Sequence, residues 1–310
     1  MATGGHALML IDGAGILGQV THVYNSPFCF VASRFMTVAV GWRFGEKRDS
    51  PEEGWPEEGV TGPTPWCHGP AHPRLAGNEL HIWWAELPLS DRSFSRVAST
   101  LSADERARAD RFLFERHRQN YVGAHGILRD VLSRYLDRPP ADFIFTHGPY
   151  GKPALENAEL RFNLSHCEDR VLIAVIRAGE VGVDVERLRP IQGMEGMVTQ
   201  FFAPGEIREI FALPPPLRQI GFFTAWTRKE AYVKAHGDGL TRPFDSFEVS
   251  AAPGSPPGLR NDEPLRNDAP KCSFRDIDLG PDHLGVAAVL GQIGQMRQMP
   301  WPGPLESQEP

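Results

Sequence analysis

Residues 222–240, FFTAWTRKEAYVKAHGDGL, constrain the fold of this chain more than any other stretch. Apolar side chains recur there at helical spacing and glycines follow at the end, so the pattern predicts one amphipathic helix closed by glycine. Glu230 and Lys234 lie four residues apart and share one stripe of that helix. Taken alone, such a pair is typical of a solvated ion pair that stabilises a helix by about 0.2–0.5 kcal/mol.

A second pair of acidic residues lies upstream of this helix. Residues 182–186, Gly-Val-Asp-Val-Glu, alternate as a strand does, which places Asp184 and Glu186 on one face and the two valines on the other. Two carboxylates from a strand and one from a helix, with lysines beside the third, suit a magnesium–polyphosphate site. The sequence therefore predicts Mg²⁺ ligands at Asp184, Glu186 and Glu230.

Together the two stretches resemble the signature pair of the 4'-phosphopantetheinyl transferases. The closer likeness is to the larger, pseudo-dimeric type that activates peptide and polyketide synthases. Two further motifs of that family stand in the expected order, Y-G-K-P at 150–153 and F-N-L-S-H at 162–166. The resemblance spans roughly Glu79 to Leu290, and chance is a poor explanation for all four motifs together.

The resemblance implies an α+β fold of two similar α/β halves with coenzyme A in the cleft between them. Strands and helices alternate near 79–180 and again near 181–290, which fits that arrangement. We expect the following division: an irregular or disordered extension at 1–77, the first half at 78–180, the second half at 181–291 with a flexible loop at 251–270, and a loose tail at 292–310.

The resemblance also assigns roles to individual residues. Glu230 is the candidate general base as well as a metal ligand, and Lys234 is a catalytic cation. The residues expected to bind coenzyme A are Arg108, Lys152, Pro153, Asn163, Ser165, His166, Lys229 and Lys234. Read by themselves, Ser165 and His166 suggest a nucleophile and its base, but no G-x-S-x-G elbow surrounds them. Neighbouring side chains on a strand also point to opposite faces.

The activity implied is transfer of the 4'-phosphopantetheine arm of coenzyme A to a serine of an acyl or peptidyl carrier protein. This holo-[acyl-carrier-protein] synthase reaction converts apo carrier to holo carrier and requires Mg²⁺. A non-catalytic homologue that binds coenzyme A and carrier is the alternative. A different coenzyme A enzyme, such as an acetyltransferase, would have no need for three carboxylates suited to a metal.

Composition sets further limits. The 310 residues carry a net charge of −7 without a basic tract, which argues against a nucleic-acid partner. The apolar run at 27–42 is broken by Arg34 and falls short of a membrane span. The 4 cysteines are scattered without the close spacing of a zinc site, which favours reduced thiols. We expect a cytoplasmic monomer that does not associate with membranes.

Carrier domains of this kind are acidic, and this chain is acidic too, so docking must depend on a local surface. Phenylalanines and two arginines gather just before the 222–240 stretch. We therefore expect the carrier surface around Phe201, Phe202 and the region Arg208–Phe223, with Phe222 excepted as a core residue because it shares the helix face of Trp226.

Overall fold

The computed structural model of this chain describes residues 10–12, 15–17, 69–156, 159–261 and 271–305. The chain divides into two compact units, residues 1–56 and 57–310. In the first unit, β1 (Leu10–Asp12) and β2 (Gly15–Leu17) pair antiparallel. All other described elements belong to the second unit.

A four-stranded sheet with strand order β13-β3-β7-β6 forms one part of the second unit. β13 runs parallel to β3, and the other neighbours are antiparallel. The strands are β3 (Leu80–Glu86), β6 (Arg161–His166), β7 (Arg170–Ile176) and β13 (Met296–Pro300). The helices that follow β3 are α2 (Asp91–Ser99), α3 (Ala103–Ala109) and α4 (Glu115–Leu136).

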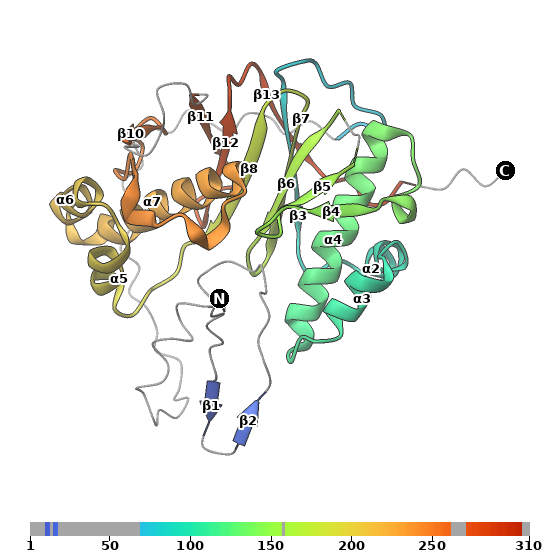
Figure 1. Cartoon of the computed structure of the whole chain (residues 1–310), viewed down its shortest axis with the longest axis horizontal. Helices are drawn as coiled ribbons and strands as arrows, with labels where there is room; N and C mark the ends of the chain where they lie inside the picture. The colour runs from blue at the N-terminus through green and yellow to red at the C-terminus, as the bar shows by residue number, and fades with distance from the viewer. Residues whose placement is uncertain (1–9, 13–14, 18–68, 157–158, 262–270, 306–310) are drawn as a thin grey trace, which may run out of the picture. The chain divides into compact units, whose positions relative to one another are not determined.

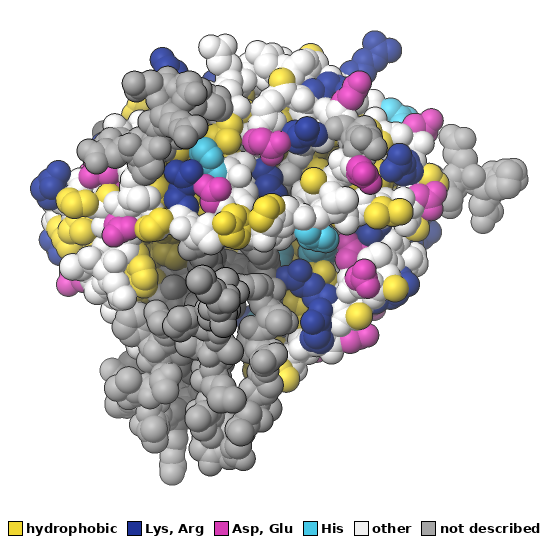
Figure 2. Space-filling view, in the orientation of Figure 1, with side chains coloured by type: hydrophobic (Ala, Val, Ile, Leu, Met, Phe, Trp, Pro, Cys, Tyr) yellow, Lys and Arg dark blue, Asp and Glu magenta, His cyan; other side chains and the backbone are white. Residues whose placement is uncertain are grey.

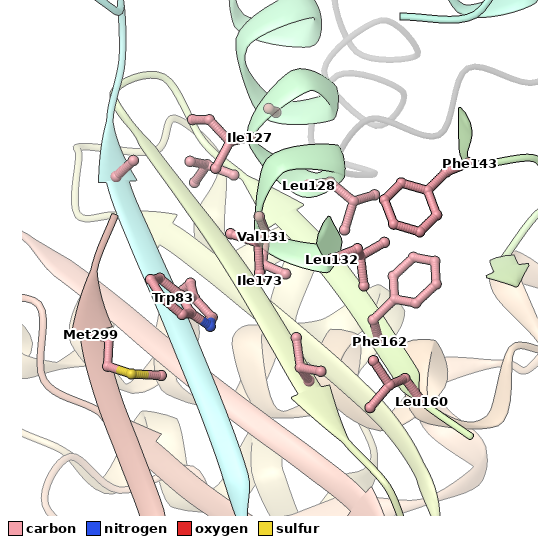
Figure 3. Packing of buried hydrophobic residues seen from close by; sticks show 14 of the residues in the cluster. Trp83, Ile127, Leu128, Val131, Leu132, Phe143, Leu160, Phe162, Ile173 and Met299 are labelled. Atoms are coloured by element: carbon pink, nitrogen blue, oxygen red, sulfur yellow. The ribbon is translucent and has the colours of Figure 1, made fainter. Parts of the chain in front are cut away.

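The 22-residue helix α4 covers this sheet with its apolar face. Figure 3 shows Leu128 and Leu132 of α4 directed toward Phe143 and Phe162, with Trp83 of β3 nearby in the same cluster. These side chains are at most 3 % exposed. Burial of large apolar side chains, at about 25 cal/mol per Å², holds the helix on the sheet.

A three-stranded sheet with strand order β11-β12-β8 forms the other part. Its strands are all antiparallel: β8 (Glu180–Arg187), β11 (Cys272–Ile277) and β12 (His283–Leu290). A second 22-residue helix, α7 (Pro215–His236), packs on β8 and β12. Figure 1 shows α4 in green and α7 in orange flanking the strands β6 and β8, which contact each other.

Short elements complete the second unit. Those between α4 and β6 are η2 (Pro140–Asp142), β4 (Phe145–His147) and β5 (Pro153–Leu155). Those that precede or follow α7 are α5 (Met194–Phe201), α6 (Pro204–Ala212), η3 (Gly239–Thr241), η4 (Phe244–Ser246), β9 (Glu248–Val249) and β10 (Leu259–Asn261). Among the described residues, no helix combines the length and the apolar character that crossing a membrane requires.

The expected α+β class is confirmed by this mixture of helices and sheets. The helix expected at residues 222–240 begins earlier than its apolar period indicates, at Pro215, because proline fits the first turn of a helix, where no amide hydrogen is needed. It ends at His236, where Gly237 adopts the left-handed conformation with φ of 76°.

The loose tail expected at 292–310 is wrong over its first part. Met296–Pro300 form the edge strand β13, and Trp301 Nε1 donates to Asp130 Oδ2 at 2.7 Å. The segment MRQMP lacks the alternation and β-branched residues that are typical of a strand. Its pairing with β3 and the burial of Met299 in the core order it. Residues 262–270 of the expected flexible loop and residues 306–310 of the expected tail lie outside the described residues.

Candidate active site

The site depends on a close approach between β8 and α7. A Cβ atom on Gly182 would lie 2.0 Å from Ala231 O and 2.3 Å from Ala235 N, so only glycine allows the helix backbone to pack directly on the strand. This approach brings the carboxylates of β8 beside the polar stripe of α7.

Ser165, Asp184 and Lys234 form one hydrogen-bonded group at this contact. Asp184 Oδ1 accepts from Ser165 Oγ at 3.0 Å and lies 2.6 Å from Lys234 Nζ. Lys234 Nζ also donates to Ser165 Oγ at 3.0 Å. The three side chains come from β6, β8 and α7, so the structure joins two sequence motifs and the central helix in one place.

The other two predicted metal ligands lie beside this group. Glu186 is 2 % exposed and Glu230 5 % exposed. Burial, together with the neighbouring charges of Asp184 and Glu186, raises the pKa of Glu230 to about 8 against the opposing effect of Lys234. The positive charge of Lys234 is therefore too small to keep the Glu230 pKa at its ordinary value beside two other carboxylates.

The donor set fits a magnesium ion. Asp184 Oδ2 is buried and makes no hydrogen bond, while Oδ1 is already used by Ser165 and Lys234. An oxygen left unsatisfied in the interior is costly unless a ligand or cation completes it. Carboxylate oxygens are the ligands that Mg²⁺ prefers, and two or three of them leave coordination positions for phosphate and water.

Lys234 provides the positive charge of the group. Its burial works to lower its pKa, but Asp184 and Glu230 more than offset this, so the pKa of Lys234 is raised above its ordinary value. Lys234 therefore stays protonated across the neutral range and can act as a point cation toward phosphate.

A row of basic and aromatic side chains, formed by His166, His125, Tyr121 and Arg108, lies next to this group beside α4. His166, at the end of β6, has a pKa lowered to about 4 by burial and by the nearby His125 and Lys234. The rings of His125 and Tyr121 lie 4.1 Å apart, and the Arg108 guanidinium lies 5.5 Å from the Tyr121 ring. Figure 2 shows Lys or Arg and His side chains gathered over the lower part of α4.

Glu105 of α3 contacts this row of side chains through His125. Its carboxylate accepts from Ser102 N at 2.8 Å in a capping box at the start of α3, and it contacts Arg129 at 2.8 Å and His125 at 3.5 Å. Although burial opposes ionisation, the hydrogen bond from His125 and the other partners lower the pKa of Glu105 to about 2. The Glu105 carboxylate therefore holds His125 through its Nδ1 atom.

The remaining coenzyme candidates occupy different places. Lys152 Nζ donates to Ala235 O at 2.9 Å and to Glu180 Oε2 at 2.9 Å, at the end of α7 that carries Lys234. Pro153 begins β5 directly after it. Asn163 is 5 % exposed, and its Oδ1 accepts from Val183 N at 2.9 Å, which ties β6 to β8.

Lys229 is the candidate that the structure does not bring to the group. It is fully buried, and its Nζ lies 2.8 Å from Glu206 Oε1 and donates to Phe244 O and Phe247 O, each at 2.5 Å. Its Nζ is also 4.0 Å from the centre of the Phe247 ring. These contacts pair the Lys229 ammonium group inside the core, beside α6 and β9. The expected contact of Lys229 with phosphate is therefore corrected to a structural role.

Glu206 was missed in the sequence. It is 1 % exposed, and its carboxylate accepts from Ala203 N at 2.9 Å and Val249 N at 2.8 Å. The signal that could have found it is a glutamate in the first turn of a helix that begins at Pro204, where a side chain can reach back to the amide before the helix.

The expected carrier surface also changes. Phe202 and Phe223, which were expected at that surface, are at most 2 % exposed and belong to the core, as Phe222 does in agreement with expectation. The aromatic rings of Phe202, Phe222 and Trp226 stack on one another, which explains the excess of phenylalanine before the helix. Larger exposed apolar side chains stand at the start of α4, where Leu113 is 93 % and Phe114 66 % exposed.

Family comparisons agree with this geometry. The 4'-phosphopantetheinyl transferase superfamily matches residues 180–286, and the N-terminal part of a 4'-phosphopantetheinyl transferase matches residues 86–177. The first match contains β8 and α7, and the second contains α4 and β6. The chain belongs to the 4'-phosphopantetheinyl transferase superfamily, as its sequence motifs indicated, and is an enzyme of the transferase class.

Individual relatives cover most of the second unit. The chain is similar to the 4'-phosphopantetheinyl transferase HetI of Nostoc sp. strain PCC 7120, with 37 % identity over 228 residues, which is 72 % of this chain and 92 % of the relative. It is also similar to the 4'-phosphopantetheinyl transferase Sfp of Bacillus subtilis strain 168, with 29 % identity over 167 residues, or 54 % of this chain and 73 % of the relative.

Proposed function

We propose that this enzyme uses coenzyme A and Mg²⁺ to transfer 4'-phosphopantetheine to a serine hydroxyl of an acyl or peptidyl carrier protein. The observation that carries the proposal is the buried group of Asp184, Ser165 and Lys234, with Glu186 and Glu230 beside it and one Asp184 oxygen unsatisfied. A structural core would gain nothing from three carboxylates gathered at one buried contact.

The residues divide the work between binding and chemistry. Asp184 Oδ2, Glu186 and Glu230 would hold Mg²⁺, which when bound supplies positive charge to the pyrophosphate of coenzyme A. Lys234 adds a second positive charge beside the one that Mg²⁺ would supply. The Ser165 hydroxyl holds Lys234 and Asp184 in position by accepting from the first and donating to the second. Displacement at phosphorus needs such positioning and charge more than covalent participation by the protein.

The bonds exchanged are defined by this reaction. The serine oxygen of the carrier forms a bond to the phosphorus next to the pantetheine arm, and the bond from that phosphorus to the bridging oxygen breaks. Adenosine 3',5'-bisphosphate leaves. By analogy with the family, Glu230 is the base we assign to the serine proton, acting directly or through a water molecule.

Coenzyme A is proposed to lie between the part built on α4 and the part built on α7, an arrangement of two similar halves. Side chains from both parts support this position, since His125 of α4 and Lys234 of α7 each act on His166 of β6. Arg108, which lies over the Tyr121 ring, and Lys152, which lies at the C-terminal end of α7, are the cations we assign to the nucleotide phosphates.

The proposal is tested by incubating the enzyme with coenzyme A, Mg²⁺ and purified apo carrier domains of peptide, polyketide and fatty-acid synthases. Intact-mass spectrometry should show one phosphopantetheine added to the carrier serine, with no addition when Mg²⁺ is removed. Asp184→Asn keeps the shape of the side chain and should lower kcat/KM by at least about 100-fold, since even an outer partner of a metal ligand is worth about 10- to 100-fold.

Two outcomes would contradict the proposal. If the enzyme binds coenzyme A and carrier but no carrier gains mass, the non-catalytic alternative holds. If Asp184→Asn turns over at the wild-type rate with the same Mg²⁺ dependence, Asp184 does not hold the metal. Circular dichroism and the melting temperature of the variant show whether its fold is intact.

A further inference from the structure

A second cluster of metal-binding side chains lies outside the proposed magnesium site. Cys167 and Asp169 stand in the turn between β6 and β7, and His283 is the first residue of β12. Their ligand atoms all lie within 4.8 Å of one another. The family reaction as derived above uses none of the three.

Two of the three donor–donor distances lie close to those around a tetrahedral ion. Asp169 Oδ1 lies 3.6 Å from Cys167 Sγ and 2.8 Å from His283 Nε2. Zinc bonds of about 2.3 Å to sulfur and about 2.0–2.2 Å to nitrogen and oxygen place neighbouring donor atoms about 3.4–3.6 Å apart. The sulfur–oxygen distance already matches, and the nitrogen–oxygen pair need open by only about half an ångström.

The surroundings distinguish this cluster from the magnesium site. Its donors are sulfur, imidazole nitrogen and one carboxylate oxygen, a mixture that favours Zn²⁺ over Mg²⁺. The His283 side chain is 5 % exposed and that of Asp169 is 36 % exposed, so the group has one buried side and one side open to solvent. Arg187 Nη1 lies 3.8 Å from Asp169 Oδ2 and 3.8 Å from Glu168 Oε2. Asp169 Oδ2 is not the oxygen that faces Cys167 and His283, so this arginine leaves Oδ1 to the cluster.

A simpler role for these residues is a hydrogen-bonded link between the turn and β12. The Asp169–His283 bond alone would serve that purpose. It does not account for a half-buried thiol directed at the same carboxylate oxygen, because S–H is a weak donor and adds little to such a link. A metal uses all three donors at once.

We propose that Cys167, Asp169 and His283 bind a zinc ion, with water as the fourth ligand. On binding, the Cys167 thiol loses its proton to solvent and forms a sulfur–zinc bond. The ion joins the turn after β6, in the four-stranded sheet, to the start of β12, in the three-stranded sheet. The site therefore clamps the two sheets together, and its existence does not depend on the proposed transfer reaction.

Cobalt is the probe that tests the proposal, because a Co²⁺–thiolate bond gives a near-ultraviolet charge-transfer absorption that carboxylate ligands cannot produce. Full-length protein titrated with Co²⁺ should develop this absorption at one equivalent and lose it when Zn²⁺ is added. Cys167→Ser should abolish it. The matched control is Cys272→Ser, which removes another half-buried cysteine and should leave the absorption unchanged. Asp184→Asn should also retain it, which separates this cluster from the magnesium site.

Zinc should also raise the melting temperature of wild-type protein and not that of Cys167→Ser, since a ligand that binds only the folded state stabilises it. His283→Gln provides the same test should Cys167→Ser fail to fold. The proposal is overturned if no thiolate absorption appears, if it survives Cys167→Ser or His283→Gln, or if Cys272→Ser removes it.

Discussion

Lys229 and Lys234 lie on one helix and have opposite surroundings. Lys229 shares the face of α7 that carries Phe222, Trp226 and Val233, and that face is fully buried. Burial lowers the pKa of Lys229 and raises that of its partner Glu206, so each charge depends on the other. The helical period in the sequence already placed Lys229 with the apolar residues, but the resemblance led us to expect a phosphate contact.

Lys229→Met should therefore act on stability. Removing one member of a buried ion pair leaves the other uncompensated and costs about 3–5 kcal/mol, so the variant should unfold at lower urea concentration. The coenzyme A dissociation constant of the folded fraction should stay unchanged. The double variant Lys229→Met with Glu206→Gln should recover part of the loss. Weaker coenzyme A binding with unchanged stability would return Lys229 to the phosphate site.

The ionisation of Glu105 makes the free energy of unfolding depend on pH in the acid range. Its pKa is lowered from 4.5 to about 2 in the folded protein. A depressed carboxyl pKa adds stability above the unfolded value near 4.5, and this stability is lost as pH falls through about 2. The shift of about 2.5 units corresponds to about 3 kcal/mol at about 1.4 kcal/mol per unit.

Glu105→Gln should accordingly lower the free energy of unfolding by up to about 3 kcal/mol at pH 7, and the difference from wild type should shrink toward zero near pH 2. Urea unfolding at a series of pH values measures both. Glu115→Gln, which removes an exposed carboxylate on α4, is the control and should show little difference at any pH. A constant difference for Glu105→Gln across the series would mean that its charge is not what stabilises α3 and α4.

At the scale of elements, Gly182 fixes how α7 lies on β8. Gly182→Ala would place a Cβ inside the helix backbone, 2.0 Å from Ala231 O. Backbone cannot yield as a side-chain tip does, so strand and helix must separate. We expect a loss of about 1–3 kcal/mol or more, as for overpacked cores, together with loss of transfer, because Asp184 and Lys234 move apart.

The matched control is Gly196→Ala in α5. Outside its own helix, no atom lies within 4 Å of a Cβ built at Gly196, and alanine is favoured over glycine in a helix by up to about 0.5–1 kcal/mol. This variant should be neutral or slightly more stable, with full transfer. Equal melting temperatures for Gly182→Ala and wild type would show that β8 and α7 do not need this approach.

Local sequence predicted elements better than it predicted their partners. The alternation at residues 182–186 and the glycine stop after His236 predicted β8 and the end of α7, because both signals act within a few residues. The contact of Ser165 with Asp184 depends on β6 lying beside β8, and β13 depends on β3, so neither could be predicted from local pattern. The Cys167–His283 cluster is of the same kind, since its members lie far apart in sequence.

At the scale of the whole molecule, the structure moves the start of the folded core. Residues 69–77 were expected to belong to an irregular extension, and they are irregular, but they pack on the first sheet. Leu75 is 8 % exposed and belongs to the apolar cluster between α4 and the four-stranded sheet. Arg177 Nε donates to Leu75 O at 3.1 Å, and Glu79 Oε2 accepts from Ala76 N at 3.1 Å. Family matches begin only at residue 86, so they cannot place this boundary.

Two truncations should therefore behave differently. A chain of residues 69–310 should keep both transfer and the melting temperature of the full chain, because it retains every contact described for α4, α7 and the two sheets. A chain of residues 78–310 should be less stable by about 2–5 kcal/mol, the usual cost of removing a buried leucine. Leu75→Ala in the longer truncation should reproduce most of that loss and so identify the side chain responsible. If both truncations melt together, residues 69–77 contribute nothing to the core; if 69–310 already loses stability, the preceding residues do.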